Sequence, residues 1–331
     1  MTLPSITILS LGGTIAMTAS DAGGVVPTLT GEKLVAAVPQ LQHVARITAR
    51  SFRQLPSAHL GFADIEELAA CIRQLAGDGA QGFVITQGTD TIDETAFALD
   101  CLLDIPVPVV VTGAMRNPTV PGADGPANLL AAVQVAASDA ARGLGCVVVM
   151  NDEVHAARYV RKLHTSRPNA FDSPACGRIG WLTEGRLRMA AQPPRTICIE
   201  QSKQPKPALV ALATACIDDH GEMVRALRSA GFDGLVIQAT GGGHVTEGLA
   251  DALEEAAKAI PVVLASRTGA GDVLRATYGY AGSEMDLLRR GLIRAGMLDG
   301  PKARVLLTLL LRHQTPGRDM IAQAFSAWSN D

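Results

Sequence analysis

The sequence predicts an α/β fold with two domains, and three observations lead to this prediction. Short β-branched runs alternate along the chain with longer amphipathic segments, which is typical of strands connected by helices. The strand-like runs are almost continuously apolar, as expected for strands that helices cover on both faces. A chain of 331 residues is also about twice the roughly 150 residues of a common domain.

The first half of the chain predicts a larger N-terminal domain over residues 1–191, with a mostly parallel sheet flanked by helices. Its nearly continuous apolar runs are the expected strands, and the amphipathic segments between them are the expected helices. The strands are expected at ITILSL from Ile6, GFVIT at 82–86, VPVVVTG at 107–113 and LGCVVVM at 144–150, with helices at 64–75 and 128–141.

Prolines mark the boundary between the two halves. QPPR and KQPKP lie within residues 192–208, and proline cannot lie in a central strand or in the interior of a helix. We interpret this segment as a linker. The alternation then resumes in ALVALAT, GLVIQATGGG and IPVVLAS, which predicts a smaller C-terminal α/β domain with a parallel sheet over residues 209–331.

The composition excludes several classes of protein. A hydrophobic content of 47%, a charged content of 18% and a net charge of -3 describe a globular chain without a basic face, so we expect no nucleic-acid partner. No apolar run is long enough to span a membrane, and the N-terminus lacks a basic signal-peptide region, so we expect a cytoplasmic protein without a membrane partner. The histidines show no ligand spacing, and we expect no metal and no other cofactor. The cysteines form no CxxC pair, and buried free thiols are the simplest interpretation.

LGGTIA, at residues 11–16, is the first segment that could carry chemistry. Gly12 and Gly13 allow the backbone to pass close to a ligand, and Thr14 follows them at the end of a predicted strand. Ligands of open α/β sheets gather at such strand ends. The segment lacks the third glycine of GxGxxG and the lysine of a phosphate loop, which disfavours a phosphate ligand. A structural turn remains an equally good interpretation of this segment alone.

A second hydroxyl and a carboxylate follow the next strand, in QGTDTIDE. Thr91 and Glu94 are expected to form a capping box at the start of a helix. This leaves Thr89 and Asp90 unexplained beside a helix N-terminus, where N–H groups favour developing negative charge. A solvated turn is the alternative.

A basic run that includes Lys162 follows the strand ending at Met150, and such runs are usually solvated. A lysine close to an acid and a hydroxyl would nonetheless make a base, because burial favours the neutral amine. In the second domain, the glycine clusters QATGGGHV and SRTGAGDV are more often turns than ligand loops. His244 and Glu284 are the polar groups near them that could bind a ligand.

These segments occur together in an order that is similar to a known family. LGGTIA, TQGTDT, VTGAMR, ADGPANL, MND and KARVLL follow one another across nearly the whole chain, which resembles the bacterial-type L-asparaginase (asparaginase/glutaminase) family. The resemblance implies hydrolysis of L-asparagine, a small-molecule amino-acid amide, to L-aspartate and ammonia through a threonine acyl-enzyme. It also implies a homotetramer of close dimers, in which the C-terminal domain completes the site of a neighbouring subunit.

The resemblance assigns roles to individual residues. It places the nucleophile on Thr14, and the second threonine, the aspartate and the lysine on Thr89, Asp90 and Lys162. An amino-acid substrate would have its carboxylate bound by Ser57 and its ammonium group held by Asp90 and Glu284, because a cation in a partly dry site needs acidic partners. The implied substrate-binding residues are Ser57, Ala58, Gly88, Ala114 through its carbonyl facing the leaving amide nitrogen, His244, and Glu284 lent by a neighbour.

Departures from the family pattern leave the preferred amide open. Gln87 stands where a histidine is common in the family, and Leu11 stands where a threonine is common. Val25 stands where the family usually has a tyrosine that contacts the nucleophile, so that contact cannot be assigned. Ala58 replaces a glutamine, and His244 replaces an asparagine that reaches in from the neighbour.

Three alternative functions remain from the sequence. The same machinery could act on another carboxamide, such as glutamine or a D-amino acid amide. A subunit of a tRNA-dependent amidotransferase would carry an additional N-terminal domain, for which the strand from Ile6 is expected to leave no room. A non-catalytic sensor would bind an amino acid in the same cleft without forming product.

Overall fold

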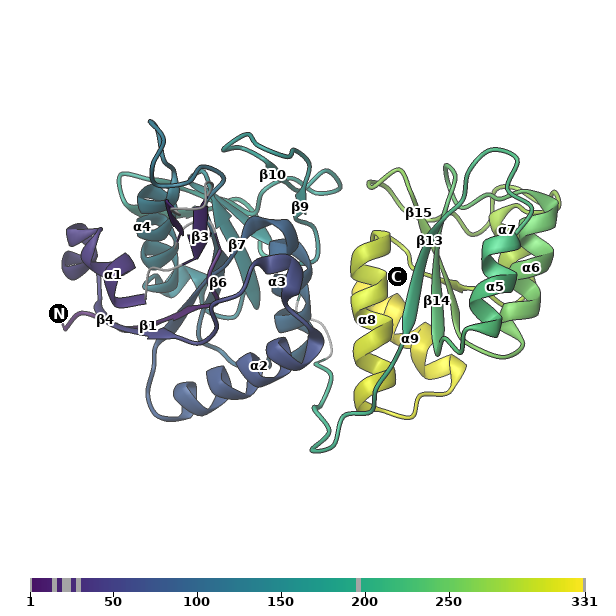
Figure 1. Ribbon diagram of the computed structural model, residues 1–331, viewed down its shortest axis with the longest axis horizontal. Helices are drawn as coiled ribbons and strands as arrows, with labels where there is room; N and C mark the ends of the chain where they lie inside the picture. The colour runs from purple at the N-terminus through teal and green to yellow at the C-terminus, as the bar shows by residue number, and fades with distance from the viewer. Residues whose placement is uncertain (1, 14–16, 20–24, 28–30, 195–197, 330–331) are drawn as a thin grey trace. The chain divides into compact units, whose positions relative to one another are not determined.

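The protein, seen here as a computed structural model, folds into two units, Met1–Arg195 and Thr196–Asp331 (Figure 1). The structure describes residues 2–13, 17–19, 25–27, 31–194 and 198–329. Each unit has its own sheet and its own flanking helices, which confirms the predicted fold class. In the part of the chain that the structure describes, no helix combines the length and apolar character needed to cross a membrane.

The sheet of the N-terminal unit is parallel in its centre and antiparallel at one edge. Its strands are ordered β12-β11-β8-β7-β6-β5-β1-β4. Neighbours from β4 to β7 pair in parallel, whereas β8, β11 and β12 extend the sheet in antiparallel fashion. The bounds are β1 Ser5–Ser10, β4 Arg46–Ser51, β5 Gly82–Thr86, β6 Val109–Thr112, β7 Cys146–Met150, β8 Glu153–Ala156, β11 Gly180–Thr183 and β12 Arg186–Met189.

Two short hairpins accompany this sheet. Strands β2 (Met17–Ala19) and β3 (Val25–Pro27) pair with each other, and Val25 lies opposite Ala19. Strands β9 (Arg161–Lys162) and β10 (Phe171–Asp172) form the second hairpin, which carries Lys162.

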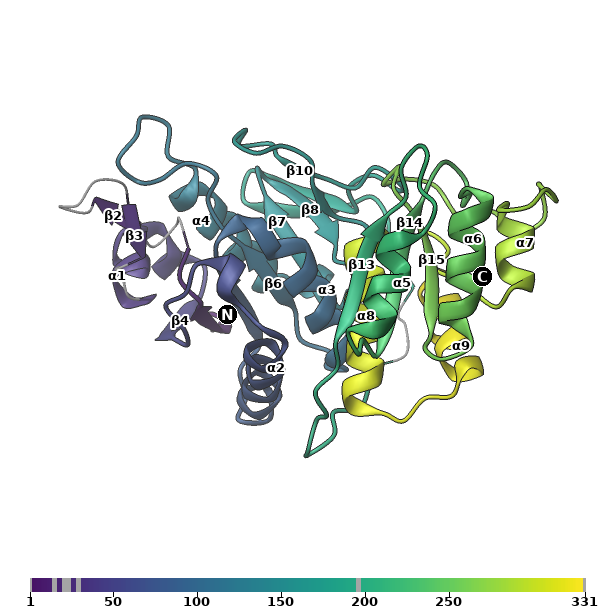
Figure 2. The ribbon, with the colours of Figure 1, turned by 45° about the vertical axis from the view of Figure 1, so that its right-hand side comes forward.

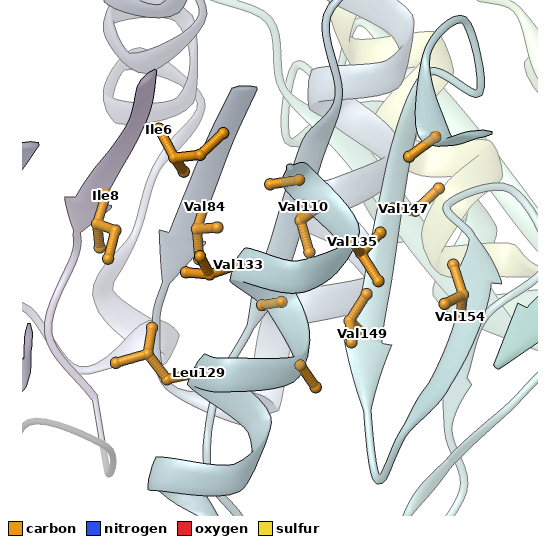
Figure 3. Close-up of a cluster of buried hydrophobic side chains, with 14 of the residues drawn as sticks. Ile6, Ile8, Val84, Val110, Leu129, Val133, Val135, Val147, Val149 and Val154 are labelled. Carbon is orange, nitrogen blue, oxygen red and sulfur yellow. The ribbon is translucent and has the colours of Figure 1, made fainter. Parts of the chain in front are cut away.

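Helices cover both faces of the large sheet (Figures 1 and 2). Apolar side chains of α4, including Leu129 and Val133, lie against Ile8, Val84 and Val110 of the strands (Figure 3). Neighbouring strand residues alternate between faces, so the intervening side chains point toward the opposite face. The helices are α1 Gly31–Ala36, α2 Phe62–Gly77, α3 Ile92–Leu102 and α4 Gly125–Ala136, with short 3-10 turns at η2 Pro39–His43, η3 Ser57–His59, η4 Thr89–Thr91 and η5 Asp139–Ala141.

The C-terminal unit contains a smaller parallel sheet, ordered β13-β14-β15-β16. Helices α5 and α6 cover one face and α8 covers the other (Figure 1). Asp299 caps α8, because its carboxylate accepts a hydrogen bond from the Lys302 backbone N–H at 3.0 Å. The bounds are β13 Val210–Thr214, β14 Gly234–Ala239, β15 Val262–Ser266, β16 Ile293–Arg294, α5 Glu222–Ser229, α6 Glu247–Ala257, α7 Glu284–Arg289, α8 Gly300–His313 and α9 Arg318–Ser329.

The cysteines are free thiols, but they are not all buried. Cys101 and Cys146 lie in the core, whereas Cys176 and Cys216 are exposed. The expectation of buried thiols is therefore wrong for the exposed pair. Both exposed residues lie in loops after short strands, outside the apolar layers.

Candidate active site

The candidate site lies where the central strands of the N-terminal unit end. Strand β1 pairs with β4 on one side and with β5 on the other. The chain connections therefore run in opposite directions from β1, which makes its carboxyl end a topological switch point. Ligands of open parallel sheets bind at such points, because the loops diverge there and leave a crevice. The loops after β5 and β6 carry four of the candidate residues, Gly88, Thr89, Asp90 and Ala114.

The glycines after β1 allow two loops to touch through their backbones. Gly13 has a φ of +84°, and a Cβ placed on it would lie 2.0 Å from the Gly88 nitrogen. A side chain at residue 13 would therefore push the loop after β5 away. Close backbone contact thus explains this glycine better than a simple turn does. Thr14, the next residue in the sequence, lies outside the described residues.

Lys162 joins two groups that follow β5. Its Nζ donates hydrogen bonds to Thr89 Oγ1 at 2.9 Å and to Asp90 Oδ1 at 2.6 Å. The Asp90 side chain is 70% exposed, so the ion pair contributes at most about 1 kcal/mol to stability. An amine between a hydroxyl and a carboxylate can instead take up and return a proton. The structure thus brings together Thr89, Asp90 and Lys162.

Asp93 helps to place this lysine, although it is not among the candidate residues of the sequence analysis. Its Oδ2 accepts a hydrogen bond from the Lys162 backbone N–H at 3.3 Å. Asp93 lies in the first turn of α3, so it ties the β9–β10 hairpin to the helix that follows Thr89 and Asp90. Its position three residues after Asp90 was the available signal, since both then face outward from one helical turn.

The expected capping box at Thr91 is wrong. Thr91 is the N-cap of α3, but its side chain makes no capping hydrogen bond. Its Oγ1 donates to the Ser57 carbonyl at 3.1 Å instead. This hydrogen bond connects the loop after β5 to the segment that carries Ser57. The Glu94 backbone N–H, which a capping box would use, donates to Asp93 Oδ1 at 3.2 Å.

Ser57 lies directly against the loop after β5. A Cβ on Gly88 would lie 2.7 Å from the Ser57 Oγ, so the two residues are in contact. Ser57 is buried and Ala58 is exposed. Ser57 and Gly88 are thus brought beside Thr89.

The loop after β6 completes this group. A Cβ on Gly113 would lie 3.2 Å from Thr89 Cγ2 and 2.6 Å from the Gln87 carbonyl oxygen. Ala114, the next residue, is 1% exposed. Its backbone therefore lies close to Thr89, where a carbonyl group could accept a hydrogen bond from a bound substrate.

His244 and Glu284 form a second cluster, within the C-terminal unit. Glu284 is fully buried, and its Oε1 accepts hydrogen bonds from the backbone N–H groups of Thr277 and Tyr278 at 2.8 and 2.7 Å. Its Oε2 lies 3.2 Å from His244 Nε2, and the His244 ring packs edge-on against Tyr278 at 4.9 Å. A direct contact of Glu284 with substrate stays a prediction.

Burial alone raises the pKa of the Glu284 carboxyl, but the hydrogen bonds outweigh it. The N–H groups of Tyr278 and Thr277 hold the pKa below its ordinary value of 4.5, and His244 lowers it further. The Glu284 carboxylate is therefore negative at neutral pH and is an acceptor for the His244 ring.

A hollow of about 530 Å³ opens beside Asp90 and Lys162. His164 lines it and was not selected from the sequence, although it lies only two residues after the lysine. Its Nδ1 accepts hydrogen bonds from the Ser166 and Arg167 N–H groups at 3.1 and 3.2 Å. This leaves Nε2 as the donor nitrogen of the neutral ring. The other lining residues are Leu163 and Thr165.

No metal site accompanies these groups in the described ranges. There, no three or more His, Cys, Asp and Glu side chains are arranged to hold a metal ion.

His155 on β8 supports the hairpin that carries Lys162. Its Nδ1 lies 2.9 Å from the Ser173 hydroxyl, and Ser173 directly follows β10. The His155 ring is fully buried. Burial lowers the pKa of this imidazole below its ordinary value of 6.5, although the Glu153 carboxylate acts in the opposite direction. His155 is therefore neutral in the folded chain at neutral pH.

The chain is expected to lose stability in acid partly through His155. As the pH falls below 6.5, the unfolded chain binds a proton at this imidazole, whereas the folded chain does not until its lower pKa is reached. The free energy of unfolding therefore falls with pH across this window. Urea midpoints at about pH 7 and about pH 5.5 should differ more in the wild type than in His155→Gln. An equal change of the urea midpoint with pH in the wild type and in His155→Gln would contradict the assignment of this acid sensitivity to His155.

Two family models match the chain. The model described as asparaginase, N-terminal, matches residues 5–195. The model described as glutaminase/asparaginase C-terminal domain matches residues 209–325. The two matches follow the same order as the two structural units.

The chain is also similar to known proteins over nearly its whole length. It is 39% identical to the probable L-asparaginase of Deinococcus radiodurans, with 93% of each chain covered. It is 35% identical to the probable periplasmic L-asparaginase of Haemophilus influenzae, with 98% of this chain and 93% of that protein covered. The crystal structure of the probable cytoplasmic L-asparaginase from Campylobacter jejuni matches with a TM-score of 0.89 and 32% identity, covering 98% of this chain and 99% of that one.

Proposed function

The chain belongs to the asparaginase family, and from this premise we propose that it hydrolyses L-asparagine to L-aspartate and ammonia. The family matches confirm the resemblance carried by the sequence motifs. The observation that carries the proposal is the placement of Lys162 Nζ within hydrogen-bond distance of both Thr89 and Asp90. This group lies at the switch point of the sheet, where a small ligand binds.

In the proposed reaction, the Thr14 hydroxyl attacks the carbon of the side-chain carboxamide. Its support is the family motif and the packing of Gly13, its neighbour in the sequence, against Gly88. A tetrahedral oxyanion forms and accepts hydrogen bonds from backbone N–H groups near Gly13 and Thr89. The C–N bond breaks once the nitrogen is protonated, so ammonia leaves and an acyl-enzyme remains. Water then attacks the ester and releases L-aspartate.

Lys162 would supply the proton relay for these steps. In its neutral form, the amine takes the proton that the attacking hydroxyl loses, with Thr89 as its hydrogen-bonded neighbour. It then returns a proton to the leaving nitrogen. The Asp90 carboxylate, 2.6 Å from Nζ, stabilises the ammonium form in between. General acid–base catalysis of this kind contributes about a hundred- to ten-thousand-fold to a rate.

Substrate binding is assigned to groups around this relay. Ser57, which contacts Gly88, would bind the substrate carboxylate. The substrate ammonium needs acidic partners, since a cation is costly to desolvate unpaired. Asp90 is the exposed carboxylate, whereas Glu284 is buried and hydrogen-bonded within the C-terminal unit. We therefore assign the ammonium group first to Asp90.

Glutamine is the second candidate substrate, because the matching C-terminal family model is described as glutaminase as well as asparaginase. Glutamine has one more methylene than asparagine, and one methylene in a pocket changes specificity by only about 10- to 200-fold. The homotetramer, with sites completed by a neighbouring subunit, stays a prediction. So does the cytoplasmic location, since related proteins are named both cytoplasmic and periplasmic.

A panel of amides tests the proposed function. Purified protein is incubated with L-asparagine, D-asparagine, L-glutamine and D-glutamine, and both ammonia and the amino acid product are measured. We expect the highest kcat/KM with L-asparagine, with one L-aspartate formed for each ammonia released. A higher kcat/KM with L-glutamine than with L-asparagine would make L-glutamine the preferred substrate. Thermal stabilisation by L-asparagine without any ammonia would contradict hydrolysis and favour the sensor.

A further inference from the structure

Asn128 connects three loops at the site through a single buried side chain. It lies in the first turn of α4 and is 3% exposed. Its Nδ2 donates to the Gly113 carbonyl at 3.0 Å and to Asp124 Oδ2 at 3.1 Å. Its Oδ1 accepts a hydrogen bond from the Asn151 backbone N–H at 3.0 Å. The orientation of the amide is thus fixed by a carbonyl on one side and an N–H on the other.

Asp124, four residues earlier in the sequence, holds the next stretch of the same loop. Its Oδ2 accepts a hydrogen bond from the Met115 N–H at 3.0 Å, and its Oδ1 accepts one from the Arg116 N–H at 2.9 Å. We call Asp124 and Asn128 the clasp. The clasp holds the peptide groups on both sides of Ala114, through the Gly113 carbonyl before it and the Met115 N–H after it.

This arrangement fixes the direction of the Ala114 carbonyl. The Ala114 carbonyl and the Met115 N–H belong to one planar peptide group, which is trans. In a trans peptide the C=O points opposite to the N–H. Because the Met115 N–H points at the Asp124 carboxylate, the Ala114 oxygen must point away from the clasp. Rotation of this peptide would break the hydrogen bond between Asp124 and the half-buried Met115 N–H.

The loop that carries Ala114 lies beside the proton relay. Gly113 packs against Thr89, whose Cγ2 would lie 3.2 Å from a Cβ on Gly113. Thr89 in turn accepts the hydrogen bond from Lys162. The loop held by the clasp is therefore in contact with the proton relay.

We propose that Asp124 and Asn128 are positioning residues that aim the Ala114 carbonyl at the leaving amide nitrogen. The proposal rests on the proposed function. In the tetrahedral intermediate, this nitrogen carries two N–H groups and one lone pair. A carbonyl that accepts one N–H fixes the direction of the lone pair, which must receive a proton before the C–N bond breaks. The clasp thereby acts on leaving-group departure, and it accounts for the aspartate and asparagine of ADGPANL.

A leaving group without an N–H tests this role. L-aspartate β-methyl ester presents the same amino acid to the nucleophile, but its methoxide leaving group cannot donate to a carbonyl. The variants are Asp124→Ala and Asn128→Leu, and the control is Gln134→Leu, which removes an amide from the same helix near Gly185. Folding is checked by the melting temperature and by circular dichroism.

We expect kcat/KM for L-asparagine to fall by about a hundred-fold in both clasp variants, because small misplacements of a positioning group have effects of this size. For the methyl ester it should fall by less than about ten-fold, which a general loss of structure could not produce. Gln134→Leu should match the wild type with both substrates.

An equal fall for amide and ester in a folded variant would overturn the proposal, because the clasp would then serve only the structure. If Asn128→Leu does not fold, the comparison in Asp124→Ala decides alone, since Asp124 is partly exposed and water can reach the N–H groups that the substitution releases. Failure of the proposed function is distinguishable, because the wild type itself would then release no ammonia from L-asparagine.

Discussion

Lys162→Met is expected to lower the rate of ammonia release from L-asparagine by about a hundred- to ten-thousand-fold, the usual range for the loss of a general acid–base group. Methionine has nearly the length of lysine but carries no titratable nitrogen. The change therefore removes the hydrogen bonds to Thr89 and Asp90 while it keeps most of the side-chain volume. The chain should stay folded, because the Asp90 side chain remains 70% exposed and needs no partner in water.

Lys258→Met is the matched control for this variant. Lys258 forms an ion pair with Glu255 at 2.8 Å, and both side chains are more than half exposed. The control thus removes a surface lysine with its carboxylate partner, and turnover should equal that of the wild type. Steady-state ammonia release and melting temperature are measured for all three proteins. A Lys162→Met protein within ten-fold of the wild type would mean that another group moves the proton.

The centre of the fold was predictable because buried parallel strands leave a strong signal in the sequence. GFVIT and CVVVM are almost continuously apolar, and the structure buries every residue of both β5 and β7. The antiparallel edge was not predictable in the same way. Strand β12 is RLRM with alternating partial exposure, so its sequence resembles that of a polar loop. A strand of four residues offers too little periodicity to distinguish the two.

The candidate site was predictable only in part. Thr89 and Asp90 follow a strand, which suggested a ligand, but Lys162 is more than seventy residues away in the sequence. Within the sequence, only the family resemblance connects Lys162 with Thr89 and Asp90. The helix-capping pattern at Thr91 was misleading, because the Thr91 hydroxyl donates a hydrogen bond to the carbonyl of Ser57, which belongs to a distant segment of the sequence. Local patterns cannot report such partners.

The roles of Asn128 and Asp93 could not be predicted from local sequence patterns either. Both residues lie in the first turns of helices, where polar side chains are common, so the sequence does not distinguish them from ordinary helix-start residues. Their importance follows from which backbone groups they meet, and this depends on the register of β6, β7 and β9. The close approach of Gly13 to Gly88 is likewise a property of packing between loops. The sequence indicates that glycine allows the backbone to pass close to a neighbour, and the structure shows that any side chain at residue 13 would collide with Gly88.

Thr14→Val is expected to lower turnover of L-asparagine by about ten-thousand-fold or more, because removal of a nucleophile abolishes the covalent path and leaves only binding and the oxyanion donors. Valine keeps the β-branched shape of threonine, so it tests the hydroxyl rather than the volume. The preceding Gly13 contact with Gly88 is made by backbone and should survive the substitution. The variant should therefore bind L-asparagine without converting it, which calorimetry and ammonia release measure separately.

Thr89→Val distinguishes the proposed role of Thr89 in the proton relay from that of Thr14 as the nucleophile. Thr89 accepts the Lys162 hydrogen bond at 2.9 Å, so its loss should slow the relay but leave a nucleophile in place. Rapid acid quenching with L-aspartate β-methyl ester, followed by mass spectrometry of peptides, should then find an aspartyl ester on Thr14 in Thr89→Val and none in Thr14→Val. An ester on Thr89, or substantial turnover by Thr14→Val, would reverse the assignment. Thr89 would become the nucleophile, since its oxygen already lies beside the amine that could deprotonate it.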